Sequence, residues 1–135
     1  MDWWLNVIRM ITNSESATTP VLPELFGIAS IDSPGLLTLN TGLRIRLLGI
    51  RRNEDKALEA MEFLRRMLEG QLVFMKHDKV KTDHLGTELV YLYLENGSFL
   101  NALLVKYDLV DVEDTIPFKY KERFQKRQAD NRAPK

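Results

Sequence analysis

The sequence contains no cysteine and only two histidines among its 135 residues. Without cysteine there is no disulfide framework, no thiolate nucleophile and no thiolate metal site. No stretch approaches the roughly 20 consecutive apolar residues that span a bilayer. The sequence also lacks a glycine-rich phosphate loop, an HExxH zinc motif and a nucleophile elbow. We therefore expect an intracellular protein without a transmembrane segment.

Neither sign of charge is in excess, because 19 Lys and Arg balance 19 Asp and Glu. The charges are nevertheless segregated along the chain. Residues 119–135 carry seven Lys or Arg against two acids, a net charge of +5, so the rest of the chain carries −5. A basic face can therefore exist without a basic isoelectric point.

The N-terminal residues have the pattern of a short amphipathic helix followed by a Ser-, Thr- and Pro-rich linker. The apolar residues at helical spacing are Trp3, Trp4, Val7, Ile8 and Ile11. We interpret the chain as an N-terminal helix and linker, one domain and a basic tail, at residues 1–24, 25–130 and 131–135. The helix either packs back on the domain or docks on a protein partner or membrane surface through Trp3, Trp4 and Ile8.

The domain shows strand and helix patterns in an order that predicts a small β-barrel with appended helices, an α+β class that is mainly β. Strands are predicted at residues 25–31, 36–40, 43–50, 71–76 and 87–94, with an extended piece at 109–112. Helices are predicted at residues 54–69, at 98–107 and from 117 onward. We expect Asn53 to cap the first helix and Gly70 to end it. Ser98 is expected to cap the second helix and Pro117 to open the last.

Three ungapped segments, in the right order, resemble the staphylococcal-nuclease-like (thermonuclease) family. Residues 44–50 (RIRLLGI) are similar to the family's R-[VL]-R-L-[IL]-G-[IV]. Residues 82–93 (TDHLGTELVYLY) resemble its T-D-[KR]-Y-G-R-x-L-[AV]-Y-[LIV]-[YFW], and residues 100–112 (LNALLVKYDLVDV) its V-N-x-x-L-[VI]-x-x-G-L-A-x-V. The resemblance implies a five-stranded OB-fold barrel with three helices.

The family's reaction is Ca²⁺-dependent hydrolysis of phosphodiester bonds. The resemblance implies a glutamate that activates or positions water, two arginines that stabilise charge on the phosphate, and two aspartates that hold the metal. A hard cation requires oxygen ligands and the developing charge on phosphorus requires positive donors, which explains this set. The first arginine falls on Arg46 and the glutamate on Glu54.

The other family positions are altered in this sequence. The metal aspartates fall on Arg51 and on Gly35, or Pro34 in a shifted alignment, and the second arginine falls on Thr87. An arginine in place of a carboxylate repels a divalent cation. Loss of one charge-stabilising donor costs on the order of 10²–10³ in rate. We therefore predict that the Ca²⁺ site is lost, that no cofactor is bound, and that the retained arginine and glutamate are vestigial.

The same changes leave a pocket suited to an anion. Four arginines lie within nine residues on one strand and its exit: Arg44, Arg46, Arg51 and Arg52. The family's nucleotide contacts fall on His84 and Leu85. We predict a non-catalytic domain that binds a phosphate-bearing ligand or nucleic acid through these arginines, His84 and the basic C-terminal helix.

Two other hypotheses stay open. One is a protein–protein or membrane-proximal adaptor that uses the N-terminal tryptophans. The other is a metal-dependent phosphodiesterase in which Asp32 or Asp83 supplies a displaced ligand. Two histidines without a third ligand are a weak metal signal. For Tyr91 and Tyr93, burial in a strand is a better interpretation than base stacking.

Overall fold

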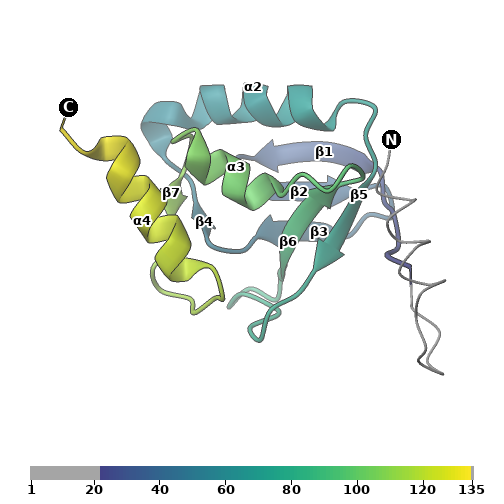
Figure 1. Ribbon diagram of the computed structural model, residues 1–135. Coiled ribbons are helices and arrows are strands. Elements are labelled where there is room, and N and C mark those ends of the chain that lie inside the picture. Colours follow the sequence, from purple (N-terminus) through teal and green to yellow (C-terminus); the bar gives the residue numbers. More distant parts are fainter. Residues whose placement is uncertain (1–21, 135) are drawn as a thin grey trace, which may run out of the picture.

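The computed structural model describes residues 22–134, which form a five-stranded sheet with helices packed around it (Figure 1). The sheet order is β1-β2-β3-β6-β5, and β4 pairs with β7 in a separate two-stranded sheet. The strands are β1 (Ile28–Ser33), β2 (Leu36–Leu39), β3 (Arg44–Leu47), β4 (Ile50–Arg51), β5 (Val73–Lys76), β6 (Glu88–Leu94) and β7 (Asp111–Val112). The helical elements are a 3₁₀ turn η1 (Glu54–Lys56), α2 (Ala57–Leu68), α3 (Leu100–Lys106) and α4 (Lys121–Arg132). The predicted α+β class is confirmed.

The first three strands form an antiparallel meander because tight turns separate short apolar segments. Pro34 and Gly35 form the first turn, and Gly42, with φ of 93°, lies in the second. Alternate side chains of β2 and β3 are buried: Leu37, Leu39, Ile45 and Leu47. Because strand side chains alternate between faces, Arg44 and Arg46 project to the side opposite this core.

The first strand begins later than predicted, at Ile28, and continues to Ser33. The reason is that Phe26 pairs with Val73 of β5, each backbone N–H donating to the other's carbonyl at 2.8 and 2.9 Å. This pair draws the two edges of the sheet together, as in an OB-like barrel.

The centre of the sheet is the parallel pair of β3 and β6, in which Arg46 lies opposite Leu89. Strand β6 is buried on both faces, so the alternation of its side chains does not separate a buried face from an exposed one. Tyr91 is 4% exposed and therefore belongs to the core. Tyr93 is half-buried and stacks on Phe99, with ring centroids 4.7 Å apart.

The prediction of one continuous strand over residues 43–50 is wrong. The chain turns at Leu48 and Gly49, where Gly49 has φ of 83°. A Cβ atom at Gly49 would lie 2.6 Å from the Phe118 ring, so the turn also admits a core side chain. Residues 50–51 consequently leave the main sheet and pair with β7, Arg51 lying opposite Asp111.

Helix α2 starts at Ala57, three residues later than predicted, because residues 54–56 form the 3₁₀ turn. The predicted cap, Asn53, caps that turn instead: its Oδ1 accepts the N–H of Asp55 at 3.0 Å. Gly70, with φ of 68°, follows the helix end as predicted. The buried face of α2 consists of Ala60, Leu64 and Leu68.

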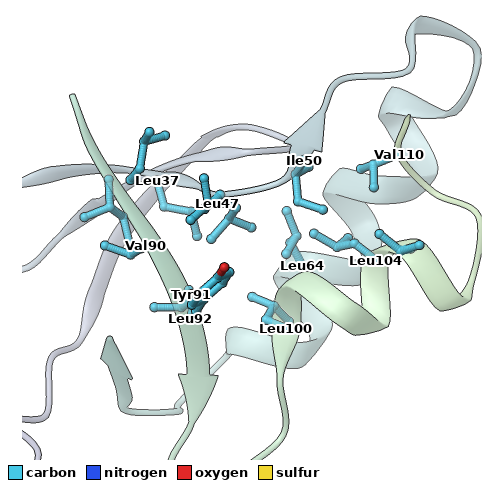
Figure 2. Close-up of a cluster of buried hydrophobic side chains, with 14 of the residues drawn as sticks. Leu37, Leu47, Ile50, Leu64, Val90, Tyr91, Leu92, Leu100, Leu104 and Val110 are labelled. Atoms are coloured by element: carbon cyan, nitrogen blue, oxygen red, sulfur yellow. The ribbon is translucent and has the colours of Figure 1, made fainter. Parts of the chain in front are cut away.

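A buried asparagine fixes helix α3 against the sheet. Asn101 accepts the N–H of Leu92 at 2.9 Å and donates to the carbonyls of Leu48 and Val90 at 2.9 and 3.1 Å. The predicted cap, Ser98, is not the residue before the helix, since Ser98 N–H donates to Asn96 within the preceding turn. Leu100 and Leu104 join Leu64 and Ile50 in the core (Figure 2).

The last helix, α4, begins at Lys121 rather than at Pro117. The intervening residues are held in other contacts: Phe118 packs against Gly49, and the Lys119 N–H donates to Asp78 Oδ2 at 2.8 Å. The other end of α4 is anchored by Arg132, which pairs with Asp108 and Asp111 at 2.9 and 2.7 Å. No helix within residues 22–134 is long and apolar enough to cross a membrane.

Candidate functional site

A pocket of about 250 Å³ opens where the β1–β2 turn, β3, the exit of β4 and the loop before β6 meet. Its lining contains three of the four predicted arginines, Arg44, Arg46 and Arg52. Gly35 and Thr87, the positions of a lost family aspartate and arginine, lie in the same lining. The structure therefore brings together residues that the family resemblance grouped across more than fifty positions of sequence.

Arg46 is held by a buried carboxylate rather than left free in the pocket. Its Nη1 lies 3.2 Å from Oδ2 of Asp83, whose side chain is only 3% exposed. Asp83 Oδ1 accepts the N–H groups of Leu85 and Thr87, both at 2.9 Å. Burial raises the pKa of Asp83, but the Thr87 N–H, Arg46 and the Leu85 N–H together hold it below its ordinary value. This arginine therefore orders the loop that closes the pocket.

Arg44 and Arg52 are paired more loosely. Arg44 Nε lies 3.8 Å from Asp32 and Arg52 Nε lies 3.2 Å from Glu54, with the two arginine side chains 60% and 50% exposed. Exposed ion pairs contribute about 0–1 kcal/mol, so an incoming anion can replace such carboxylate partners at little cost. Asp32 is itself fixed by the hydroxyl groups of Thr38 and Ser30, which hold its pKa below the ordinary value.

Three predicted site residues lie outside the lining of this pocket. Arg51 turns toward Asp111 and Asp114, with nitrogen–oxygen distances of 3.9 and 3.7 Å. Glu54 opens the 3₁₀ turn and reaches the pocket only through its pair with Arg52. His84 is exposed on the loop and is not in the lining, although its neighbours Asp83 and Leu85 are. Trp3, Trp4 and Ile8 lie outside the described residues.

The lining of the pocket offers a Ca²⁺ ion one carboxylate, that of Asp83. The two family aspartate positions carry Gly35 and Arg51, which supply no carboxylate. Asp32 and Asp83, the two candidates for a displaced ligand, are already engaged with hydroxyl groups, backbone N–H groups and arginines. Within the described part of the chain, no three His, Asp or Glu side chains are grouped so as to hold a metal.

A buried glutamate that the sequence reasoning missed lies behind the arginines. Glu113, directly after β7, accepts the N–H and hydroxyl of Thr115 at 3.1 and 2.6 Å. Burial raises its pKa, whereas Thr115 and the nearby Arg51 and Arg46 lower it, leaving the pKa below its ordinary value. Glu113 lies between Asp111 and Asp114, and no sequence pattern distinguishes it from these two acids as the buried one.

A second cationic region lies between α3 and α4, around a cavity of about 490 Å³. Its floor is apolar and its lining includes four cations: Lys106, Arg123, Lys126 and Arg127. None of the four makes an ion pair with any acid in residues 22–134, in contrast to the arginines of the first pocket. The sequence pattern identified the basic helix but missed Lys106, since one lysine at a helix end is unremarkable in sequence.

Asp114 joins Arg51 to the start of α4. Its carboxylate pairs with Arg51 at 3.7 Å, and its carbonyl accepts the Lys121 Nζ at 2.8 Å. The first residue of α4 therefore lies close to the exit of β4, at the edge of the pocket.

The sheet order, the single parallel pair and the pocket beside β3 define an OB-like α+β domain with a cationic site on its barrel wall. A family model described as "Staphylococcal nuclease homologue" matches residues 29–135. The chain therefore belongs to the staphylococcal nuclease homologue family. A comparison with curated proteins gives no match.

Proposed function

We propose that this chain is a non-catalytic member of its family that binds nucleic acid or another phosphate-bearing ligand. Binding uses the arginine pocket and the basic C-terminal helix. The observation that carries the proposal is the charge of the pocket lining, which contains three arginines and one carboxylate, Asp83. That carboxylate is committed to Arg46 and to its own loop, so the pocket favours an anion over a cation.

The absence of catalysis follows from the residues that would have to perform it. Thr87 provides no cation to stabilise a developing phosphorane charge. Glu54 is exposed and paired with Arg52, outside the pocket lining. With no carboxylates placed to hold a divalent ion, the proposed site requires neither Ca²⁺ nor another cofactor.

The existing ion pairs of each cation support an assignment of the phosphate contacts. Arg46 is tied to a buried acid, so its release would leave an unpaired buried charge. Arg44 and Arg52 are exposed and weakly paired, and Lys126 and Arg127 make no ion pair within residues 22–134. We therefore assign the phosphate contacts to these four residues.

The test is binding of a fluorescently labelled short oligonucleotide, single-stranded or duplex, with EDTA present and salt varied. Two double variants remove the assigned cations, Arg44→Gln with Arg52→Gln and Lys126→Gln with Arg127→Gln. Each lost phosphate contact lowers the slope of log affinity against log salt by about 1, so each double variant should lower it by about 2.

The matched control is Arg65→Gln with Lys79→Gln, two exposed positions outside both cationic regions, which removes the same charge from another surface. Equal losses in all three double variants would show that only net charge matters. No binding by the wild-type chain at low salt would refute the proposal. Cleavage of the oligonucleotide with Ca²⁺, Mg²⁺ or Mn²⁺ that is abolished by Glu54→Gln would instead establish a phosphodiesterase.

A further inference from the structure

An apolar groove of about 690 Å³ lies between α2 and α3. Its floor is formed by Phe63, Met67, Leu103 and Leu109. Two large apolar residues in its lining are left in water: Leu58 is 86% exposed and Tyr107 is 53% exposed. Exposed apolar residues gathered along a groove are typical of a docking site for an amphipathic helix.

We propose that residues 1–12 of this same chain occupy the groove, with Trp3, Trp4 and Ile8 as the buried anchors. The apolar residues of that segment recur at the helical spacing that groove binding requires. A helix over residues 3–11 would be about 14 Å long, against about 18 Å for the twelve residues of α2. The groove shares Leu103 with the cationic region between α3 and α4 but contains none of the arginines of the first pocket, and the proposal does not depend on the proposed function.

The position of the chain start makes this docking intramolecular. Phe26 pairs with Val73, which follows the end of α2 by five residues, so the described chain begins beside the C-terminal end of α2. Residues 13–21 can extend about 30 Å, more than the length of α2. The segment can therefore reach either end of the groove from its own attachment point, at the high effective concentration of a short linker.

Charge on the rim selects one orientation. Glu59 lies near the start of α2 and Arg66 near its end, and both line the groove. The docking segment carries Asp2 and Arg9. An antiparallel arrangement places Arg9 near Glu59 and Asp2 near Arg66, and it also opposes the two helix dipoles favourably.

The tryptophans supply a direct measurement, because Trp3 and Trp4 are the only two in the sequence. Their emission is compared in the wild-type chain, in Leu58→Glu, and in the control Leu72→Glu, which alters a 42% exposed leucine outside the groove. We expect short-wavelength emission protected from acrylamide in the wild type and in the control. Leu58→Glu should shift emission to longer wavelength and raise quenching toward that of a free peptide of residues 1–12.

Circular dichroism on all three proteins establishes that the domain stays folded. Wild-type emission equal to that of the free peptide, or unchanged emission in Leu58→Glu, would overturn the proposal. Emission that shifts on dilution would assign the groove to a second copy, and a further blue shift on adding anionic lipid vesicles would assign the tryptophans to a membrane surface. Arg9→Glu should release the segment and shift the tryptophan emission to longer wavelength. Adding Glu59→Arg to the same chain should restore the wild-type emission, and failure of that restoration would overturn the antiparallel orientation.

Discussion

Replacing Gly49 with alanine tests the turn that separates β3 from β4. Gly49 has φ of 83°, a left-handed conformation that costs an alanine about 1–2 kcal/mol. The new Cβ would also lie 2.6 and 2.7 Å from two ring carbons of Phe118, against about 3.5–4.0 Å for ordinary carbon contacts. Because Phe118 belongs to the core, relieving that overlap requires repacking, which costs about 1–3 kcal/mol.

Gly49→Ala should therefore lower the free energy of unfolding by about 2–5 kcal/mol, a large share of the roughly 5–15 kcal/mol that stabilises a domain. Gly42→Ala is the matched control, since Gly42 has φ of 93° but no heavy atom within 4 Å of the added Cβ. Gly42→Ala should lower the free energy of unfolding only by the cost of placing an alanine in the left-handed conformation, about 1–2 kcal/mol. The difference between the two variants isolates the contact with the aromatic ring.

Urea unfolding followed by circular dichroism measures both variants. A smaller side chain at the contact should relieve the strain, so Gly49→Ala should cost less in a Phe118→Leu background, with a coupling energy of about 1–3 kcal/mol. Equal losses for the two glycine variants would refute the packing argument. A loss below about 1 kcal/mol at Gly49 would refute the left-handed turn itself.

Two further outcomes follow from the polar contacts. Asn101→Ala removes the partners of the Leu92 N–H and the Leu48 carbonyl, and we expect a loss of about 2–5 kcal/mol in urea unfolding. A loss below about 1 kcal/mol would contradict the buried bridge. Asp83 has a lowered folded pKa against about 4 in the unfolded chain, so its stabilisation is present above pH 4 and lost as pH falls through the folded value. Asp83→Asn should flatten the fall of the urea midpoint below about pH 4, and an unchanged slope would contradict that assignment.

Local patterns predicted most of the fold. Glycine and asparagine turns, period-two strands and the apolar stripe of α2 fixed the order of elements to within a few residues. Three of the errors share one cause, which is a long-range contact that replaced a local one. Phe26 pairs with Val73 instead of extending β1, Phe118 enters the core instead of starting α4, and the turn at Gly49 exists partly to admit that ring.

Which residues gather in the pocket could be predicted from the sequence, but the ion pairs that they form could not. The resemblance correctly placed Gly35, Arg46 and Thr87 in one pocket. It gave no indication that Arg46 would be held by Asp83, or that Arg51 would turn toward Asp111 and Asp114. Ion pairs between residues this distant depend on side-chain directions in the assembled barrel, which one sequence does not encode locally.

The parallel pairing of β3 with β6 also has a consequence for how the protein folds. Forty-two residues lie between Ile45 and its partner Glu88, and this stretch contains both α2 and β5. Pairings of such long sequence separation carry a high loop-closure cost and form late and slowly. The Arg46–Asp83 contact depends on the same pairing, so the pocket should appear only in the last folding step. An intermediate that already contains the β1–β3 meander and α2 would present the arginines on an unfinished edge, without the loop that encloses them.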